Sequence, residues 1–274
     1  NPRIYFNLAL SQQNQKNFIN SEKNYLKAVE LKSDYFLAYY NLAIVQIKLN
    51  KLDQAIIHNE NVLKINPTYK PANHNLKFAK RLKNLLDTIK DNNYFNSPVL
   101  DTDLLITKRI TYKKEIEFLS NLVIPTISET LSGPLFGNGF TSNYELFNIN
   151  NNIINSIKND LSEIVFKSLG SKIFIMDSFL NNLKGESGSK IHNHIGDFDV
   201  QNNLINRKYS LVYYLSTGDQ SCTKPGILKL YEPSKEILPN NDMILIWPAK
   251  RFHSSSYNGS ENRLMIGLNF YLLS

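Results

Sequence analysis

The stretch Tyr39-Tyr40-Asn41-Leu42-Ala43 repeats Tyr5-Phe6-Asn7-Leu8-Ala9 after 34 residues, and Asn75-Leu76 continues the series. Within each unit the apolar residues recur at helical spacing, and this spacing breaks near Asn50 and near Pro67, a residue that is accepted only at a helix start or outside a helix. The pattern predicts two helix pairs and a further helix over residues 71–90. A second set of positions has the same period: Ala28, Val29, Leu31, Tyr35 and Ala38 are followed by Val62, Leu63, Ile65, Tyr69 and Ala72.

The composition is that of a folded protein with more than one domain. The chain has 274 residues, of which 42% are apolar and 20% charged, and domains average about 150 residues. We therefore expect a repeat domain over residues 1–95 and a second domain over 96–274. The one cysteine, Cys222, excludes an intrachain disulfide and a thiolate metal cage. Without an apolar run of about 18 residues or a signal peptide, we expect a cytoplasmic protein and no membrane insertion.

The excess positive charge lies in the repeat half. Residues 1–95 contain 14 Lys and Arg against 7 Asp and Glu, whereas residues 96–274 contain 17 of each, so the net charge of +7 belongs to the first half. A basic surface attracts nucleic acid, phosphates or an acidic protein partner. The chain has no arginine-rich run and no ladder of aromatic and basic residues, which disfavours nucleic acid as a partner.

The second half reads as a run of short strands separated by turns. Asp91 to Asp103 has the composition of a linker, and helices are predicted over 112–130 and 151–169 with a short strand over 141–147 between them. Seven strands in about a hundred residues predict a jelly roll, so the whole chain is expected to be α+β. The predicted strands cover residues 173–180, 190–194, 209–215, 226–231, 243–247, 252–257 and 263–273.

Three of the five histidines fall on these strands. His192 and His194 are two positions apart, so in a strand both imidazoles point to one face, and His253 comes from a distant strand. Three ligands with open positions favour a catalytic non-haem iron over a closed structural zinc. The alternative is a surface pair with a histidine in the core. His58 and His74 lie on separate repeat helices and are interpreted as ordinary helical residues.

Arg263 begins the last predicted strand, ten residues after His253. A guanidinium that faces the interior of a jelly roll needs an anion, because an unpaired buried charge is costly. The carboxylate of a small co-substrate matches the guanidinium fork. The alternative is an arginine on the surface.

The repeats resemble tetratricopeptide repeats, although Tyr5, Tyr39, Ala9 and Ala43 stand where that family usually has tryptophan and glycine. The resemblance implies a groove that docks peptides, or a support for the second domain without a ligand of its own. From about residue 140 the chain resembles the 2-oxoglutarate and Fe(II)-dependent dioxygenases, above all a bacterial and phage subgroup with His-x-His where prolyl hydroxylases have His-x-Asp. The resemblance rests on residues 182–185, 191–194, 209–215, 226–233, 246–248, 252–254 and 261–269.

The second resemblance implies a double-stranded β-helix that binds Fe(II), 2-oxoglutarate and O2. His192 and His253 match its iron-binding histidines, and Arg263 matches the residue that holds the distal carboxylate of 2-oxoglutarate. Where the family has a carboxylate this chain has His194, so three alternatives stay open. The site has three histidines, which we favour; or Asp197 or Asp199 supplies the third ligand; or His194 is the first ligand with Gly196 in the carboxylate position, as in halogenating relatives.

Other residues are assigned to the co-substrate and the substrate. Tyr209, Ser210 and Asn182 are candidates to assist Arg263, because Met265 occupies a position where some relatives have serine. The loop from Ile195 to Lys208 is long for the family and is a candidate substrate lid.

Three classes of function follow. The first is a hydroxylase of a protein or peptide side chain docked by the repeats. The second is a small-metabolite hydroxylase, or a halogenase-like oxidase, that uses the repeats for assembly. The third is a catalytically silent metal-binding interaction protein.

Overall fold

The computed structural model describes residues 1–91, 103–122 and 140–273, and the chain divides into two compact units, Asn1–Asn96 and Ser97–Ser274. The residues of the expected linker, the turns near Gly133 and the end of the helix expected over 112–130 lie largely outside the described ranges. In the described part no helix is both long enough and apolar enough to cross a membrane.

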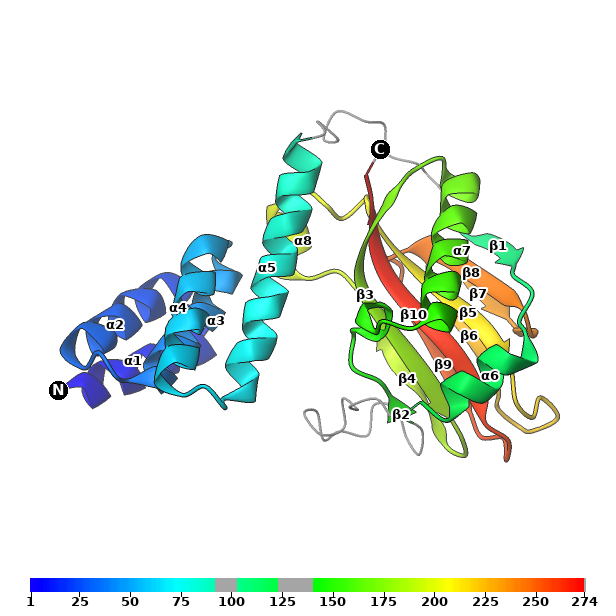
Figure 1. Ribbon diagram of the computed structural model, residues 1–274, viewed down its shortest axis with the longest axis horizontal. Helices are drawn as coiled ribbons and strands as arrows, with labels where there is room; N and C mark the ends of the chain where they lie inside the picture. Colours follow the sequence, from blue (N-terminus) through cyan, green and yellow to red (C-terminus); the bar gives the residue numbers. More distant parts are fainter. Residues whose placement is uncertain (92–102, 123–139, 274) are drawn as a thin grey trace. The chain divides into compact units, whose positions relative to one another are not determined.

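The first unit consists of helices, and the predicted repeats are confirmed. The helices are α1 (Pro2–Asn14), α2 (Phe18–Leu31), α3 (Phe36–Lys48), α4 (Leu52–Ile65) and α5 (Lys70–Asp91) (Figure 1). Ala9 and Ala43, which are 34 residues apart, are both fully buried, as are Ala28 and Val62. These small side chains lie where neighbouring helices pack, which explains why the repeat keeps them.

A polar network joins three of these helices. The His58 ring in α4 lies with its Nδ1 2.7 Å from Gln46 Oε1, and Gln46 donates to Glu22 Oε1 at 3.2 Å. The other oxygen of Glu22 accepts from Lys51 Nζ at 2.6 Å. His58 is thus a structural residue, as expected, and burial lowers its pKa although the charge of Glu22 opposes that effect.

The second unit contains two antiparallel sheets. The larger has the order β1-β8-β5-β10-β3-β2 and the smaller the order β4-β9-β6-β7, and with the covering helices they form the predicted α+β jelly-roll domain. The strands of the larger sheet are β1 (Leu105–Lys108), β8 (Met243–Pro248), β5 (Lys208–Ser216), β10 (Arg263–Leu272), β3 (Ile173–Leu183) and β2 (Phe140–Thr141). Those of the smaller sheet are β4 (Ser187–His192), β9 (His253–Tyr257), β6 (Pro225–Leu230) and β7 (Lys235–Ile237).

The larger sheet buries a different core on each face. Helix α7 (Asn152–Leu169) packs its apolar stripe on one face, against residues such as Leu268 and Phe270, and Figure 1 shows it along β3 and β10. Met265 and Trp247 belong to a second core, together with residues of the smaller sheet such as Leu228. The alternation of β10 therefore assigns Arg263, Met265, Gly267, Asn269 and Tyr271 to the face between the sheets.

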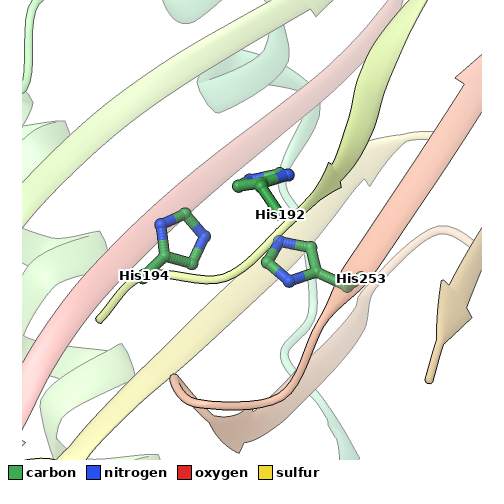
Figure 2. Close-up of side chains that lie close together, drawn as sticks. All are labelled: His192, His194 and His253. Atoms are coloured by element: carbon green, nitrogen blue, oxygen red, sulfur yellow. The ribbon is translucent and has the colours of Figure 1, made fainter. Parts of the chain in front are cut away.

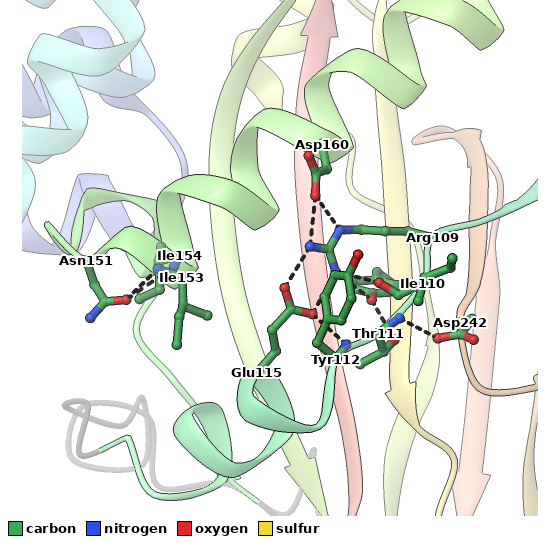
Figure 3. Close-up of polar contacts among 11 residues, drawn as sticks. Arg109, Ile110, Thr111, Tyr112, Glu115, Asn151, Ile153, Ile154, Asp160 and Asp242 are labelled. Atoms are coloured by element: carbon green, nitrogen blue, oxygen red, sulfur yellow. Dashed lines mark hydrogen bonds and ion pairs between the residues drawn. The ribbon is translucent and has the colours of Figure 1, made fainter.

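Caps and an ion pair fix the covering helices. Asn151 caps α7 by accepting from the N–H of Ile153 at 2.8 Å, and Gly170 ends the helix with a left-handed φ of 68°. Arg109 makes a two-pronged ion pair with Glu115 in α6 (Lys113–Ser120), at 2.7 and 2.8 Å, and reaches Asp160 of α7 at 2.8 Å (Figure 3). Burial alone would raise the pKa of Glu115, but Arg109 and the N–H of Tyr112 bring it below its usual value.

Three predicted elements differ from the structure. The helix expected over 112–130 is α6, which ends at Ser120. The strand expected over 141–147 is the short β2 followed by a 3-10 helix, Leu146–Asn148. The strand expected over 190–194 begins earlier, at Ser187, and ends at His192, so His194 lies beyond it. Strands β1 and β7 were not predicted, because runs of four and three residues give too weak an alternation to recognise.

Candidate metal centre

Three histidines converge between the two sheets. His192 ends β4 and His253 begins β9, and the two residues are paired directly across these neighbouring strands. His194 follows two residues after β4, where its N–H donates to the Ala249 carbonyl at 3.0 Å. Figure 2 shows the three imidazoles facing one another from these separate segments. The two-residue spacing along one strand is therefore not what brings His194 into the group.

The distances within this group suit a single ion. One nitrogen from each ring lies within 4.8 Å of the others, and the ring centroids are 4.3 to 4.9 Å apart. His192 Nδ1 lies 2.7 Å from the Lys190 carbonyl and His253 Nδ1 lies 3.3 Å from the Arg251 carbonyl. A carbonyl accepts the Nδ1 proton, so the lone pair resides on Nε2, as in histidine ligands held by a backbone partner.

The electrostatics keep the rings of His194 and His253 neutral. Burial is the largest effect on the pKa of His253, and with the neighbouring His192 it lowers that pKa to about 4. Burial also lowers the pKa of His194 well below its usual value, and His253, His192 and Lys208 add to the effect. Neutral imidazole is the form that binds a metal ion.

The two aspartates proposed as alternative ligands do not join this group in the described part of the chain. Asp199 lies in the short helix α8 (Asp197–Gln201), is buried, and accepts hydrogen bonds from Lys208 Nζ at 2.9 Å, Tyr271 Oη at 2.5 Å and the Gly196 N–H at 2.8 Å. These contacts tie α8 to the larger sheet. The segment expected to be a substrate lid is therefore anchored at Asp199.

Arg263 is a buried cation without a carboxylate partner among the described residues. Arg263 is 1% exposed, and its contacts include the Pro225 carbonyl at 3.0 Å, the Met265 sulfur at 3.3 Å and the faces of Tyr214 and Tyr257. Burial lowers its pKa from the usual value. An anion would supply the charge compensation that this site lacks.

Sequence reasoning missed the residues that shape this cationic site. Gly226 has a φ of 77°, and a Cβ there would lie 1.3 Å from Arg263 Nη1, so glycine makes room for the guanidinium. Tyr214 and Tyr257 lie with their rings 5.0 and 5.6 Å from the guanidinium carbon. The signal that could have found Tyr214 was the alternation of side chains along the strands. Met265 lies two residues after Arg263 on the same face of β10 and pairs with Tyr214, so Tyr214 shares that face.

The three candidates to assist Arg263 lie in different places. Tyr209 stacks on Phe270 in the core under α7, on the opposite face of the sheet. Asn182 pairs with Leu264, which also faces that core, whereas Asn181 faces the space between the sheets. Ser210 does face that space, but its hydroxyl donates to Asn269 Oδ1 at 2.9 Å, and Asn269 lies six positions along β10 from Arg263.

Comparisons with known proteins give three results. Residues 2–35 and 24–57 match tetratricopeptide repeat families, and a search of curated proteins finds no match. Similar solved structures include a prolyl hydroxylase from Trichoplax adhaerens in complex with a hypoxia inducible factor peptide fragment, at 15% identity, 69% coverage of this chain, 92% of that chain and a TM-score of 0.47. Another is the viral collagen prolyl hydroxylase of Paramecium Bursaria Chlorella virus-1 with 2-oxoglutarate. That structure is 14% identical, the match covers 64% of this chain and 99% of that chain, and the TM-score is 0.47.

Proposed function

We propose that the second unit is an Fe(II)- and 2-oxoglutarate-dependent dioxygenase that hydroxylates a protein or peptide side chain. The observation that carries the proposal is the pairing of two features between the same sheets. One is the group of three histidines, and the other is Arg263, a buried cation with no acidic partner among the described residues. A metal ion and a carboxylate ligand would satisfy both.

The donor set fits iron. His192, His194 and His253 supply three nitrogen donors, and imidazole suits Fe, Zn, Cu and Ni. Three protein ligands leave coordination positions open, as catalytic sites require. Bound Fe(II) with 2-oxoglutarate and O2 would supply the oxidising power: one oxygen atom of O2 would go to the substrate C–H bond and the other to 2-oxoglutarate, which would become succinate and CO2. The remaining steps belong to the protein's own residues.

Arg263 would bind the distal carboxylate of 2-oxoglutarate. The rings of Tyr214 and Tyr257 hold the guanidinium plane, and Gly226 leaves space beside Nη1. A charge-assisted pair in a buried site is stronger than the same pair in water. Trp247 lies against His253 at 5.1 Å between centroids, and with its apolar neighbours it keeps water from that side of the metal ligands.

The repeats support a macromolecular substrate. They match tetratricopeptide repeat families over residues 2–57, and proteins with such repeats use stacked helices as extended binding surfaces. The expected partner is therefore the protein or peptide that is hydroxylated. The alternative with a small metabolite assigns the repeats to assembly instead.

Succinate formation tests the proposal. The purified full chain, loaded with Fe(II) and given 2-oxoglutarate and O2, should form succinate faster when a protein extract from its source cell is added. If only the small-molecule fraction of that extract increases succinate formation, the result would favour the alternative in which the substrate is a small metabolite. No binding of Fe(II) and no consumption of 2-oxoglutarate under any condition would contradict the proposal.

A further inference from the structure

His194 is held in the candidate metal centre differently from the other two histidines. His192 and His253 lie on the paired strands β4 and β9, and the Nδ1 atom of each ring lies near a backbone carbonyl, at 2.7 and 3.3 Å. His194 lies beyond the end of β4, as Figure 2 shows, and its ring has no such carbonyl in the described part of the chain. The position of this third imidazole therefore depends on how the backbone after β4 is held.

The first attachment of this backbone leads to β5. The N–H of His194 donates to the Ala249 carbonyl at 3.0 Å, and the N–H of Ala249 donates to the Lys208 carbonyl at 2.8 Å. Lys208 is the first residue of β5, which has a neighbouring strand on each side in the larger sheet. Two backbone hydrogen bonds thus connect His194 to an interior strand of that sheet.

Asp199 supplies the second attachment. Its Oδ2 accepts hydrogen bonds from the Gly196 N–H at 2.8 Å and from Lys208 Nζ at 2.9 Å, and its Oδ1 accepts from Tyr271 Oη at 2.5 Å. Gly196 is only two residues after His194 in the chain. The carboxylate therefore closes the turn that follows the histidine and fastens it to two strands, β5 and β10.

Lys208 takes part in both attachments. Its carbonyl accepts from the Ala249 N–H, and its ammonium group donates to Asp199. Lys208 pairs with Tyr271 across β5 and β10, and Nζ lies 5.3 Å from the centre of the tyrosine ring, so the two side-chain donors to Asp199 are neighbours. Asp199, Lys208 and Tyr271 are all buried. Charge-assisted hydrogen bonds are strong in such a shielded place.

We propose that Asp199 is a positioning residue of the metal centre that acts through His194. The inference rests on the proposed function, because it takes the three histidines as the iron ligands. The charge of Asp199 is compensated by Lys208 inside the protein, so this carboxylate supports a metal ligand instead of being one. Residues that orient metal ligands contribute about 10- to 100-fold to metal affinity, and this is the size of effect expected here.

Co(II) binding by the metal-free full chain tests the inference without turnover. Calorimetry gives the affinity, and the visible spectrum of bound Co(II) reports the geometry of its ligands. Asp199→Ala should weaken Co(II) binding by about ten-fold or more, and its spectrum should shift toward that of His194→Ala. The matched control is Glu115→Ala, which removes another buried carboxylate that accepts from a cation, Arg109, and from a backbone N–H. This control should keep the affinity and the spectrum of the wild type.

Two further variants separate positioning from general destabilisation. Tyr271→Phe removes one donor to Asp199 without leaving a buried cation unpaired, so it should weaken Co(II) binding in a protein that stays folded. Adding Asp199→Ala to His194→Ala should weaken binding no further, because Asp199 acts through a ligand that is already absent.

The inference and the proposed function fail in different ways. If Asp199→Ala and Tyr271→Phe bind Co(II) as tightly as the wild type, or if Asp199→Ala causes a clear further loss in the His194→Ala background, the inference is overturned. The proposed function stands in both cases, because it depends on the histidines and Arg263. A wild type that binds no Co(II), or that binds it equally well after His194→Ala, would contradict the three-histidine centre and the inference with it.

Discussion

Two buried arginines should respond in opposite directions to the same substitution. Arg109 forms a two-pronged pair with Glu115 and a further contact with Asp160, whereas Arg263 contacts no carboxylate among the described residues. Methionine keeps most of the length of arginine and removes its charge. Comparing the free energies of unfolding of the two variants therefore isolates the destabilisation caused by the missing anion in the unliganded protein.

The expected magnitudes follow from these contacts. Arg109→Met leaves Glu115 buried and unpaired, so the free energy of unfolding should fall by about 3–5 kcal/mol. Arg263→Met removes a charge whose burial costs several kcal/mol. It also loses two cation–π contacts of about 1 kcal/mol each and one hydrogen bond of about 1.5 kcal/mol. The net change should be a stabilisation of about 1–2 kcal/mol.

Urea unfolding of the full chain measures both changes. Trp247 is the one tryptophan of the sequence and lies in the second unit, so its fluorescence reports that unit. With a divalent metal already present in both samples, adding 2-oxoglutarate at about a hundred times its Kd should stabilise the wild type by about 2.7 kcal/mol more and give Arg263→Met no further stabilisation. If Arg263→Met destabilises the unliganded unit as much as Arg109→Met does, the reasoning that Arg263 awaits an anion is refuted.

Three further predictions concern Gly226, Asp199 and His58. Gly226→Ala should displace the Arg263 guanidinium and weaken 2-oxoglutarate binding at least ten-fold, the loss expected for a charge-assisted hydrogen bond. Calorimetry should show an unchanged Fe(II) affinity, and an unchanged 2-oxoglutarate affinity would contradict the prediction. Asp199→Asn should leave Lys208 unpaired and lower the free energy of unfolding by about 3 kcal/mol in urea, and a neutral result would show that the anchor of α8 is elsewhere. Burial lowers the pKa of His58 in the folded state, so its contribution to stability is complete above about pH 6.5 and declines as the pH falls below that value. His58→Gln should therefore lose less stability than the wild type between pH 7.5 and 5.5, and an identical loss would argue against this role.

The repeats were predictable because their signal is long. The 34-residue period repeats the same small and apolar residues, and Ala9, Ala43, Ala28 and Val62 all prove buried. The longer strands of the jelly roll were predictable for the same reason, since β10 and β5 alternate over about ten residues. Short strands such as β7 carry no such pattern and depend on partners that are distant in sequence.

The site was harder to predict in detail because a shift of one residue along a strand changes the face. The sequence suggested Asn182 as a partner of Arg263, but its neighbour Asn181 is the residue that faces the space between the sheets. It likewise suggested Tyr209, but Tyr214 is the tyrosine that covers Arg263. The position of His194 depends on a backbone bond to Ala249, which no local pattern indicates. The anchoring of α8 likewise depends on Lys208 and Tyr271, which pair only once β5 and β10 are placed side by side.

Anaerobic titration with Fe(II) and 2-oxoglutarate tests the central claim most directly. The account predicts a visible charge-transfer band of the iron–2-oxoglutarate complex that saturates at one equivalent of each. The band should be lost in His253→Ala, through loss of iron, and in Arg263→Met, through loss of the co-substrate, but retained in His74→Ala. A wild type that shows no band, or a His253→Ala variant that keeps it, would contradict the account.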